Sequence, residues 1–135
     1  MDKDKVVVFE QFARKAAERL EERKKLRTET LKVKSLGDME IEIRGLTDAE
    51  INDCMDFSED SIEIDKYTVF MASKTLQEAS KILVEEGTIN QQYKITDLFT
   101  SVERKFIANR ILLLSGVTGD AGIEVMKETE EVKNS

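Results

Sequence analysis

The chain has 135 residues, of which 40% are hydrophobic and 36% are charged, and its net charge is −7. This length fits one domain with a modest hydrophobic core and strongly solvated outer faces, and the absence of proline argues against an all-β fold with many turns. Histidine is absent and cysteine occurs once, which excludes a histidine-based triad, a histidine zinc site and a disulfide within these residues.

The charge is unevenly distributed along the chain. Residues 1–35 hold eleven Lys and Arg against seven Asp and Glu, a balance of +4, whereas residues 36–65 hold eleven acidic residues against Arg44 alone, a balance of −10. Such an asymmetry influences association more than fold. Two interpretations stay open: the basic and acidic segments face each other within the monomer, or the acidic stretch is a docking surface.

The first segment has helical periodicity, which predicts a helix over residues 6–27. Its apolar positions recur at spacings of three and four: Phe9, Phe12, Ala13, Ala16, Ala17 and Leu20. The other face is charged. This narrow, alanine-rich seam suits close packing against another helix, which belongs either to this chain or to a partner.

An alternating pattern then predicts an antiparallel hairpin over residues 30–44, with a turn at residues 36–38. A three-residue loop makes four favourable pairs, two apolar and two of opposite charge: Val33 with Ile41, Leu31 with Ile43, Lys34 with Glu40, and Lys32 with Glu42. A two-residue loop would pair Val33 with Glu42, so we favour the three-residue loop.

Helices are predicted in the next part of the chain. Thr47 and Glu50 form a capping box that begins a helix running to about Phe57. After a turn at residues 58–61, helix is favoured from Lys66 onward, and a further helix over residues 76–84 stops at Gly87. These elements fit a small helical bundle.

The strongest later helix is predicted over residues 97–114, with Gly116 ending it. Its wide apolar stripe consists of Leu98, Phe99, Val102, Phe106, Ile107, Ile111 and Leu114. Residues 123–135 can form a short amphipathic helix that frays. The predicted fold class is mainly α with a small antiparallel β-hairpin (α+β): a helix, the hairpin, then a bundle of three to four helices. One domain spans residues 1–126, with its helical part over 47–126, and a charged, mobile tail spans 127–135.

Few residues suggest chemistry. The carboxylates within residues 53–65 lack the glycine and the spacing of a calcium loop, so a solvated acidic face is expected rather than a metal site. The glycine-rich segment 116–122 follows a helix and has no Gly-Lys-Ser/Thr ending, which indicates a joint between helices. Cys54 is expected to be a small, partly buried residue.

Nucleic-acid and membrane binding are not expected either. The basic patch of Lys24, Lys25 and Arg27 contains no aromatic residue, and the acidic net charge opposes attraction to phosphate. No stretch approaches the roughly 20 apolar residues of a membrane span. We therefore expect a cytoplasmic, non-catalytic protein that needs no cofactor and works by binding another protein.

One resemblance makes this expectation more specific. The segment ERKFIANRILLLSG at residues 103–116, followed by ETEEVKN at 128–134, resembles the C-terminal half of XkdN-like tail assembly chaperones of phages and prophages in low-GC Gram-positive bacteria. The strand at residues 39–44 and the helix start Leu-Thr-Asp-Ala-Glu at 46–50 also look like this family. The resemblance covers roughly residues 30–134. The proline that often lies between the family's middle helices is missing here, where residues 74–78 stand.

The resemblance implies a non-virion protein in the cytoplasm of the bacterial host. It would bind the tape-measure protein, and the tail tube protein as a second partner, until tube subunits polymerise; a homo-oligomer is compatible with this role. Four residues could line a groove for the partner or belong to the core: Phe106, Ile107, Ile111 and Leu114. The alternatives are a structural subunit of a phage tail or contractile particle, and a small bacterial adaptor or regulatory protein.

Overall fold

The computed structural model describes residues 2–126 and is mostly helical, with one two-stranded antiparallel sheet. This confirms the predicted fold class. In chain order its elements are α1 (Lys3–Lys24), β1 (Thr28–Val33), the 3-10 helix η1 (Lys34–Leu36), β2 (Met39–Arg44), α2 (Asp48–Asp56), α3 (Ser61–Met71), α4 (Lys74–Glu85), the 3-10 helix η2 (Gln92–Leu98) and α5 (Ser101–Leu114).

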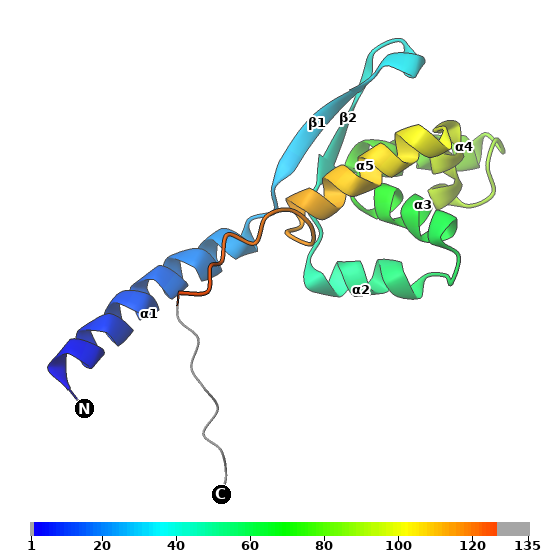
Figure 1. Cartoon of the computed structure of the whole chain (residues 1–135). Coiled ribbons are helices and arrows are strands. Elements are labelled where there is room, and N and C mark those ends of the chain that lie inside the picture. The colour runs from blue at the N-terminus through cyan, green and yellow to red at the C-terminus, as the bar shows by residue number, and fades with distance from the viewer. Residues whose placement is uncertain (1, 127–135) are drawn as a thin grey trace, which may run out of the picture.

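Helix α1 projects away from the hairpin and from the other helices (Figure 1). None of its 22 residues is buried. The helix begins and ends three residues earlier than the predicted range of 6–27. At its start, the Asp2 carboxylate accepts a hydrogen bond from the backbone N–H of Asp4 and caps the first turn. At its end, Lys25 is extended, and the chain turns there toward β1.

The hairpin has the predicted inner face but not the predicted register. Leu31 lies opposite Ile41, and Val33 opposite Met39, so the pairing is shifted by two residues. The loop is longer than expected because Lys34 leaves the strand to begin η1, and Gly37 and Asp38 both have a φ of 64°. A shift of two residues leaves every side chain on the same face, so alternation alone could not separate the two registers.

Caps explain where α2 and α3 begin. The predicted capping box of α2 is present, because the Thr47 hydroxyl accepts from the Glu50 N–H while the Glu50 carboxylate accepts from the Thr47 N–H. Helix α3 begins at Ser61, before the predicted Lys66, because the Asp60 carboxylate accepts from the Ile62 N–H at 2.9 Å. Helix α4 contains the predicted range of 76–84, and Gly87 follows it with a φ of 77°.

The last helix is shorter than predicted. Residues 97 and 98 belong to η2, and α5 begins only at Ser101, where Thr100 and Glu103 form a second capping box. Gly116 follows the helix with a φ of 77°, as expected for its end. Residues 117–126 contain no helix. Within the described part, the glycine-rich segment 116–122 therefore does not join two helices as predicted. The predicted helix at 123–135 is not formed over 123–126, and its remainder, with the predicted tail at 127–135, lies outside the described residues.

The hydrophobic core lies between the inner face of the hairpin and helices α2 to α5. It consists of the apolar side chains of Val33, Ile41, Ile43, Leu46, Cys54, Val69, Ala72, Leu76, Ile95, Phe99, Ile107, Ala108, Ile111 and Leu114. Within the predicted domain of residues 1–126, this core is therefore confined to residues 33–114. We call the part from β1 to α5, residues 28–114, the body.

Candidate protein-binding surfaces

Helix α5 divides the four residues predicted to contact a partner. Ile107, Ile111 and Leu114 are buried in the core, with exposed fractions of 3%, 0% and 7%, whereas Phe106 is 60% exposed. The apolar stripe of α5 was too wide for one buried face. Its buried side packs beneath the hairpin and against α3, and Phe106 is the member of the predicted set that is available at the surface.

The exposed side of α5 forms a ridge of two apolar side chains, Val102 and Phe106. Val102 is 81% exposed and lies one helical turn before Phe106. We call this pair the α5 ridge. The prediction did not single out Val102 as a contact residue, although its place in the α5 stripe was the available signal.

A groove runs along the hairpin side of the α5 ridge. Leu31 and Val33 of β1 form its opposite wall, and Lys32 and Lys34 belong to its rim. Ile107 of α5 also lines the groove. The groove is mostly apolar, and its charged lining consists of Lys32, Lys34 and Glu103. Leu31 is half-buried there. Its contribution could not be read from the sequence, because it depends on how the hairpin lies over α5.

A second hollow lies on the other side of the α5 ridge, toward the start of α3. It is lined by Ile62, which is 52% exposed, and by Asp65 and Lys105, whose charged groups are 3.4 Å apart. The ridge thus separates two hollows, one against the hairpin and one against α3. An amphipathic helix laid across this face could bury its apolar side on both flanks of the ridge.

Polar contacts fix the hairpin against α5. The Arg110 guanidinium donates two hydrogen bonds to the Glu29 carboxylate, at 2.8 and 2.6 Å, and they lower the pKa of Glu29. At the other end of the groove, the Ser35 hydroxyl donates to the Glu103 carboxylate, and this bond is the main cause of the lowered pKa of Glu103. The wall of the groove is therefore held at two points, which favours a preformed binding surface.

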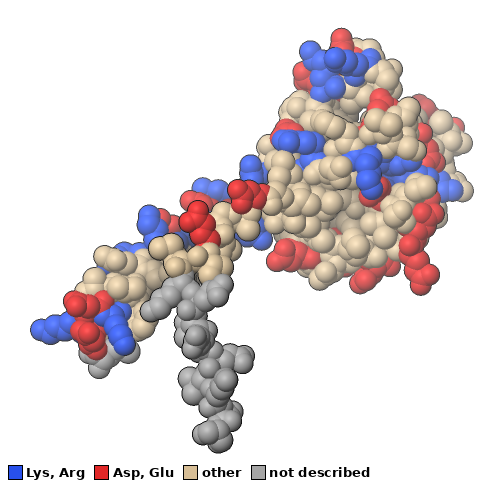
Figure 2. All heavy atoms as spheres, viewed as in Figure 1, with Lys and Arg blue, Asp and Glu red and all other residues tan. Residues whose placement is uncertain are grey.

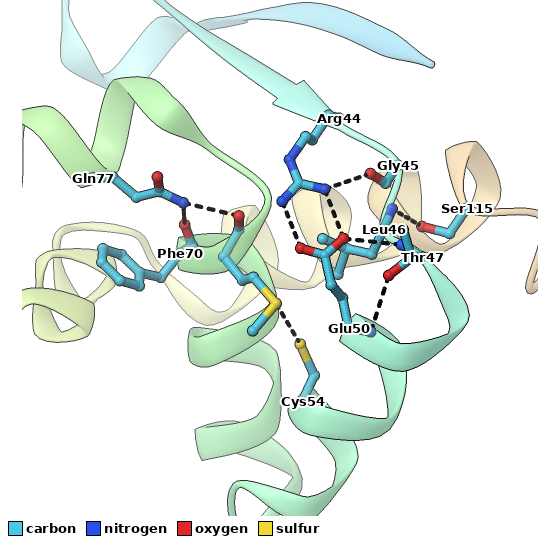
Figure 3. Close-up of polar contacts among 10 residues, drawn as sticks. Arg44, Gly45, Leu46, Thr47, Glu50, Cys54, Phe70, Gln77 and Ser115 are labelled. Atoms are coloured by element: carbon cyan, nitrogen blue, oxygen red, sulfur yellow. Dashed lines mark hydrogen bonds and ion pairs between the residues drawn. The ribbon is translucent and has the colours of Figure 1, made fainter. Parts of the chain in front are cut away.

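A polar cluster where β2 meets α2 is structural (Figure 3). The Arg44 guanidinium donates to both oxygens of Glu50, at 2.9 and 2.7 Å, and also to the carbonyl of Gly45. The Arg44 bonds are the main reason that the pKa of Glu50 falls to about 2. The hydroxyl of Ser115 accepts from the Leu46 N–H at 2.8 Å. The cluster joins the end of the hairpin to α2 and to the end of α5.

This cluster predicts a pH dependence of stability. The pKa of Glu50 is about 2 in the folded protein and 4.5 in its ordinary state, so its stabilisation is complete above pH 4.5 and is lost as the pH falls toward 2. We expect Glu50→Gln to remove roughly 1–2 kcal/mol at pH 7, after allowance for solvent screening, and little at pH 2. Urea unfolding of both proteins at several pH values measures this difference. An equal loss at pH 2 and pH 7 would contradict the assignment.

The second candidate surface is the apolar side of α1. Its seam, which we define as Val6, Phe9, Ala13, Ala16 and Leu20, lies on one face, with Phe12 and Ala17 at its borders. Phe9 is 57% exposed, Phe12 is 74% exposed and Leu20 is 65% exposed. Such a contiguous apolar face on a protruding helix is typical of a surface that packs against another protein.

Helix α1 does not lie against the acidic stretch at residues 36–65. One ion pair joins them among the described residues, between Arg23 and Asp48 at 3.9 Å, and both side chains are largely exposed. Figure 2 shows basic and acidic side chains interspersed along α1, and acidic side chains along the lower edge of the body. Most of α1 points away from the body, so this helix does not cover the acidic stretch, whereas Lys32 of the same basic segment lies opposite Glu40 in the hairpin.

The described residues bear on the sequence expectations for metal, thiol and membrane sites. Residues 2–126 contain no group of three His, Cys, Asp or Glu side chains placed to hold a metal ion. Cys54 is buried, as expected for a small core residue, and burial raises the pKa of its thiol. In the same part of the chain, no helix has both the length and the apolar character that a membrane span requires.

Comparison of the chain with family models, with curated proteins and with solved structures finds no significant match. The proposal of a function therefore rests on the exposed α5 ridge and on the sequence resemblance.

Proposed function

We propose that this protein is a non-catalytic phage tail assembly chaperone that binds amphipathic helices of a tape-measure protein across the α5 ridge. The observation that carries the proposal is the exposure of Val102 and Phe106 between two hollows of the body. A ridge of this kind can insert between the apolar side chains of a bound helix. The large apolar ring of Phe106, once buried by the partner, would be an anchor of the interface.

The charge around the ridge favours a particular kind of partner helix. Lys32 and Lys34 lie at the rim of the hairpin-side groove, whereas Lys105 on the α3 side is already paired with Asp65. A partner helix with acidic residues along the hairpin side of its apolar face would complement Lys32 and Lys34 and dock in a defined orientation. The net charge of −7 on the whole chain would keep the complex soluble while that apolar face is covered.

The identity of the partner comes from the resemblance to XkdN-like chaperones. It supports a site of action in the cytoplasm of the bacterial host and a role that ends when tail tube subunits polymerise around the tape-measure protein. The tail tube protein is then a second partner. The exposed ridge supports binding in general, and the resemblance supports this choice of partner.

Co-expression with the tape-measure protein of the same phage or prophage tests the function. We expect the chain to raise the soluble fraction of that protein and to be recovered with it in a pull-down. Phe106→Glu should weaken the complex at least about tenfold, because it places a charge where the ring would be buried. The matched control is Ile82→Glu on α4, where an isoleucine is 58% exposed away from the ridge.

The experiment has clear contrary results. Absence of a complex, with unchanged solubility of the tape-measure protein, would refute the chaperone function. Equal losses from Phe106→Glu and Ile82→Glu would refute the α5 ridge as the binding site. Recovery of the chain from purified tail particles would favour a structural subunit instead, because a chaperone leaves the assembled tail.

A further inference from the structure

We propose that α1 pairs in antiparallel orientation with α1 of a second copy of this chain, which makes the protein a dimer. The proposal concerns a surface distinct from the α5 ridge and is independent of the proposed function. Helix α1 has 22 residues, none of them buried, and an isolated helix with an apolar face is only marginally stable in water. A partner helix would cover that face.

The spacing of the α1 seam suits a helix pair. Its five residues follow one another at intervals of three, four, three and four, the pattern of two helices that wrap around each other. Antiparallel pairing can set Phe9 of each copy against Leu20 of the other, with Ala13 against Ala16 in the centre. The alanines then allow close approach while the larger side chains pack on both sides, and one surface is complementary to itself.

Charge selects the antiparallel orientation. Residues 2–13 hold three acidic and two basic side chains, a balance of −1, whereas residues 14–27 hold seven basic and three acidic side chains, a balance of +4. Parallel pairing would bring the two basic halves together. Antiparallel pairing places each basic half beside the slightly acidic half of the other copy and also aligns the helix dipoles favourably.

The shape of the protein agrees with this orientation. The body lies at the C-terminal end of α1, and the N-terminal part of the helix extends away from it (Figure 1). Antiparallel pairing would place the two bodies at opposite ends of the shared helices, so they would not compete for space. The α5 ridge of each copy belongs to the body, which leaves it available to a partner.

The expected interface is of moderate size. Phe9 and Phe12 of both copies contribute four rings, and because they are 57% and 74% exposed they would newly bury at most about 500 Å². The aliphatic seam residues bring the total toward the roughly 1,200 Å² at the lower end of stable interfaces. We therefore expect dissociation in the micromolar range and a concentration-dependent mass.

Sedimentation equilibrium of the full chain between about 1 and 100 µM tests the dimer. We expect the apparent mass to double over this range, and Phe9→Glu to keep the protein monomeric throughout. The matched control is Gln11→Glu, which adds the same side chain to the opposite face of the same turn and should leave the dimer intact. Since α1 contributes nothing to the core, neither change should lower the unfolding temperature of the body. A wild-type monomer at every concentration, or an intact Phe9→Glu dimer, would overturn the proposal.

Disulfide cross-linking tests the orientation. Positions 6 and 23 would meet in an antiparallel pair, whereas two copies of position 6 would lie about 25 Å apart. A mixture of Val6→Cys and Arg23→Cys should therefore form a mixed disulfide on oxidation, and Val6→Cys alone should not link. Cys54 is buried and stays out of the reaction. Self-linked Val6→Cys without the mixed product would show parallel pairing and overturn the antiparallel proposal.

Discussion

Replacement of Ile111 by alanine is expected to lower the free energy of unfolding by about 2–5 kcal/mol. Ile111 is completely buried in the last turn of α5, so the shorter side chain would leave a cavity among the core residues. Chemical denaturation with a probe of the whole body measures this loss. The result also bears on function, because Ile111 is one of the residues that the sequence suggested as a partner contact.

The matched control is Val102→Ala on the exposed side of the same helix. Val102 is 81% exposed, so its truncation should change stability by no more than about 0.5 kcal/mol. The same change should weaken binding of a partner helix, because it removes part of the α5 ridge. A large loss of stability from Val102→Ala, or a small one from Ile111→Ala, would mean that the two sides of α5 have been assigned incorrectly.

The second large effect is expected for Gly45→Ala, with a loss of about 3 kcal/mol. A Cβ atom at this position would lie 2.7 Å from the carbonyl oxygen of Leu114 and 3.3 Å from the backbone nitrogen of Ser115. Backbone atoms at the end of α5 cannot move aside without disturbing the bond between Ser115 and Leu46. Thermal and urea unfolding of the variant would measure the cost.

Gly87→Ala is the control that distinguishes the steric contact at residue 45 from the cost of a left-handed backbone conformation. Gly87 has a φ of 77°, but its added Cβ atom would meet nothing within 4 Å. The change should therefore cost only about 1 kcal/mol, from the left-handed backbone conformation. Equal effects at the two glycines would contradict the contact between residue 45 and the end of α5.

The proposed dimer and the proposed chaperone function use different parts of the protein. Phe9→Glu should keep the apparent mass at that of a monomer without changing the binding of one tape-measure helix to one body. Phe106→Glu should weaken that binding without changing the apparent mass. Dimerisation would place two α5 ridges on one particle. Such a particle could hold two segments of a long helical partner, which strengthens binding when both sites are occupied at once.

Local signals in the sequence determined most elements of the fold. The apolar stripe from Phe9 to Leu20 predicted a helix, alternation predicted the inner face of the hairpin, and Thr47 with Glu50 predicted the start of α2. The same kind of signal was present at Thr100 and Glu103, where it marks the true start of α5. These features depend on residues a few positions apart, so the sequence alone can reveal them.

Only the tertiary structure decided which apolar residues are covered. Phe106 and Ile107 belong to the same apolar stripe of α5 in the sequence. The packing of α5 under the hairpin and against α3 buries Ile107 and leaves Phe106 at the surface. The hairpin register was set by its loop, because a shift of two residues preserves the faces of both strands. The seam of α1 was visible as a surface suited to helix packing. The seam is exposed because α1 is directed away from the body where it joins β1. No local pattern in the sequence specifies that direction.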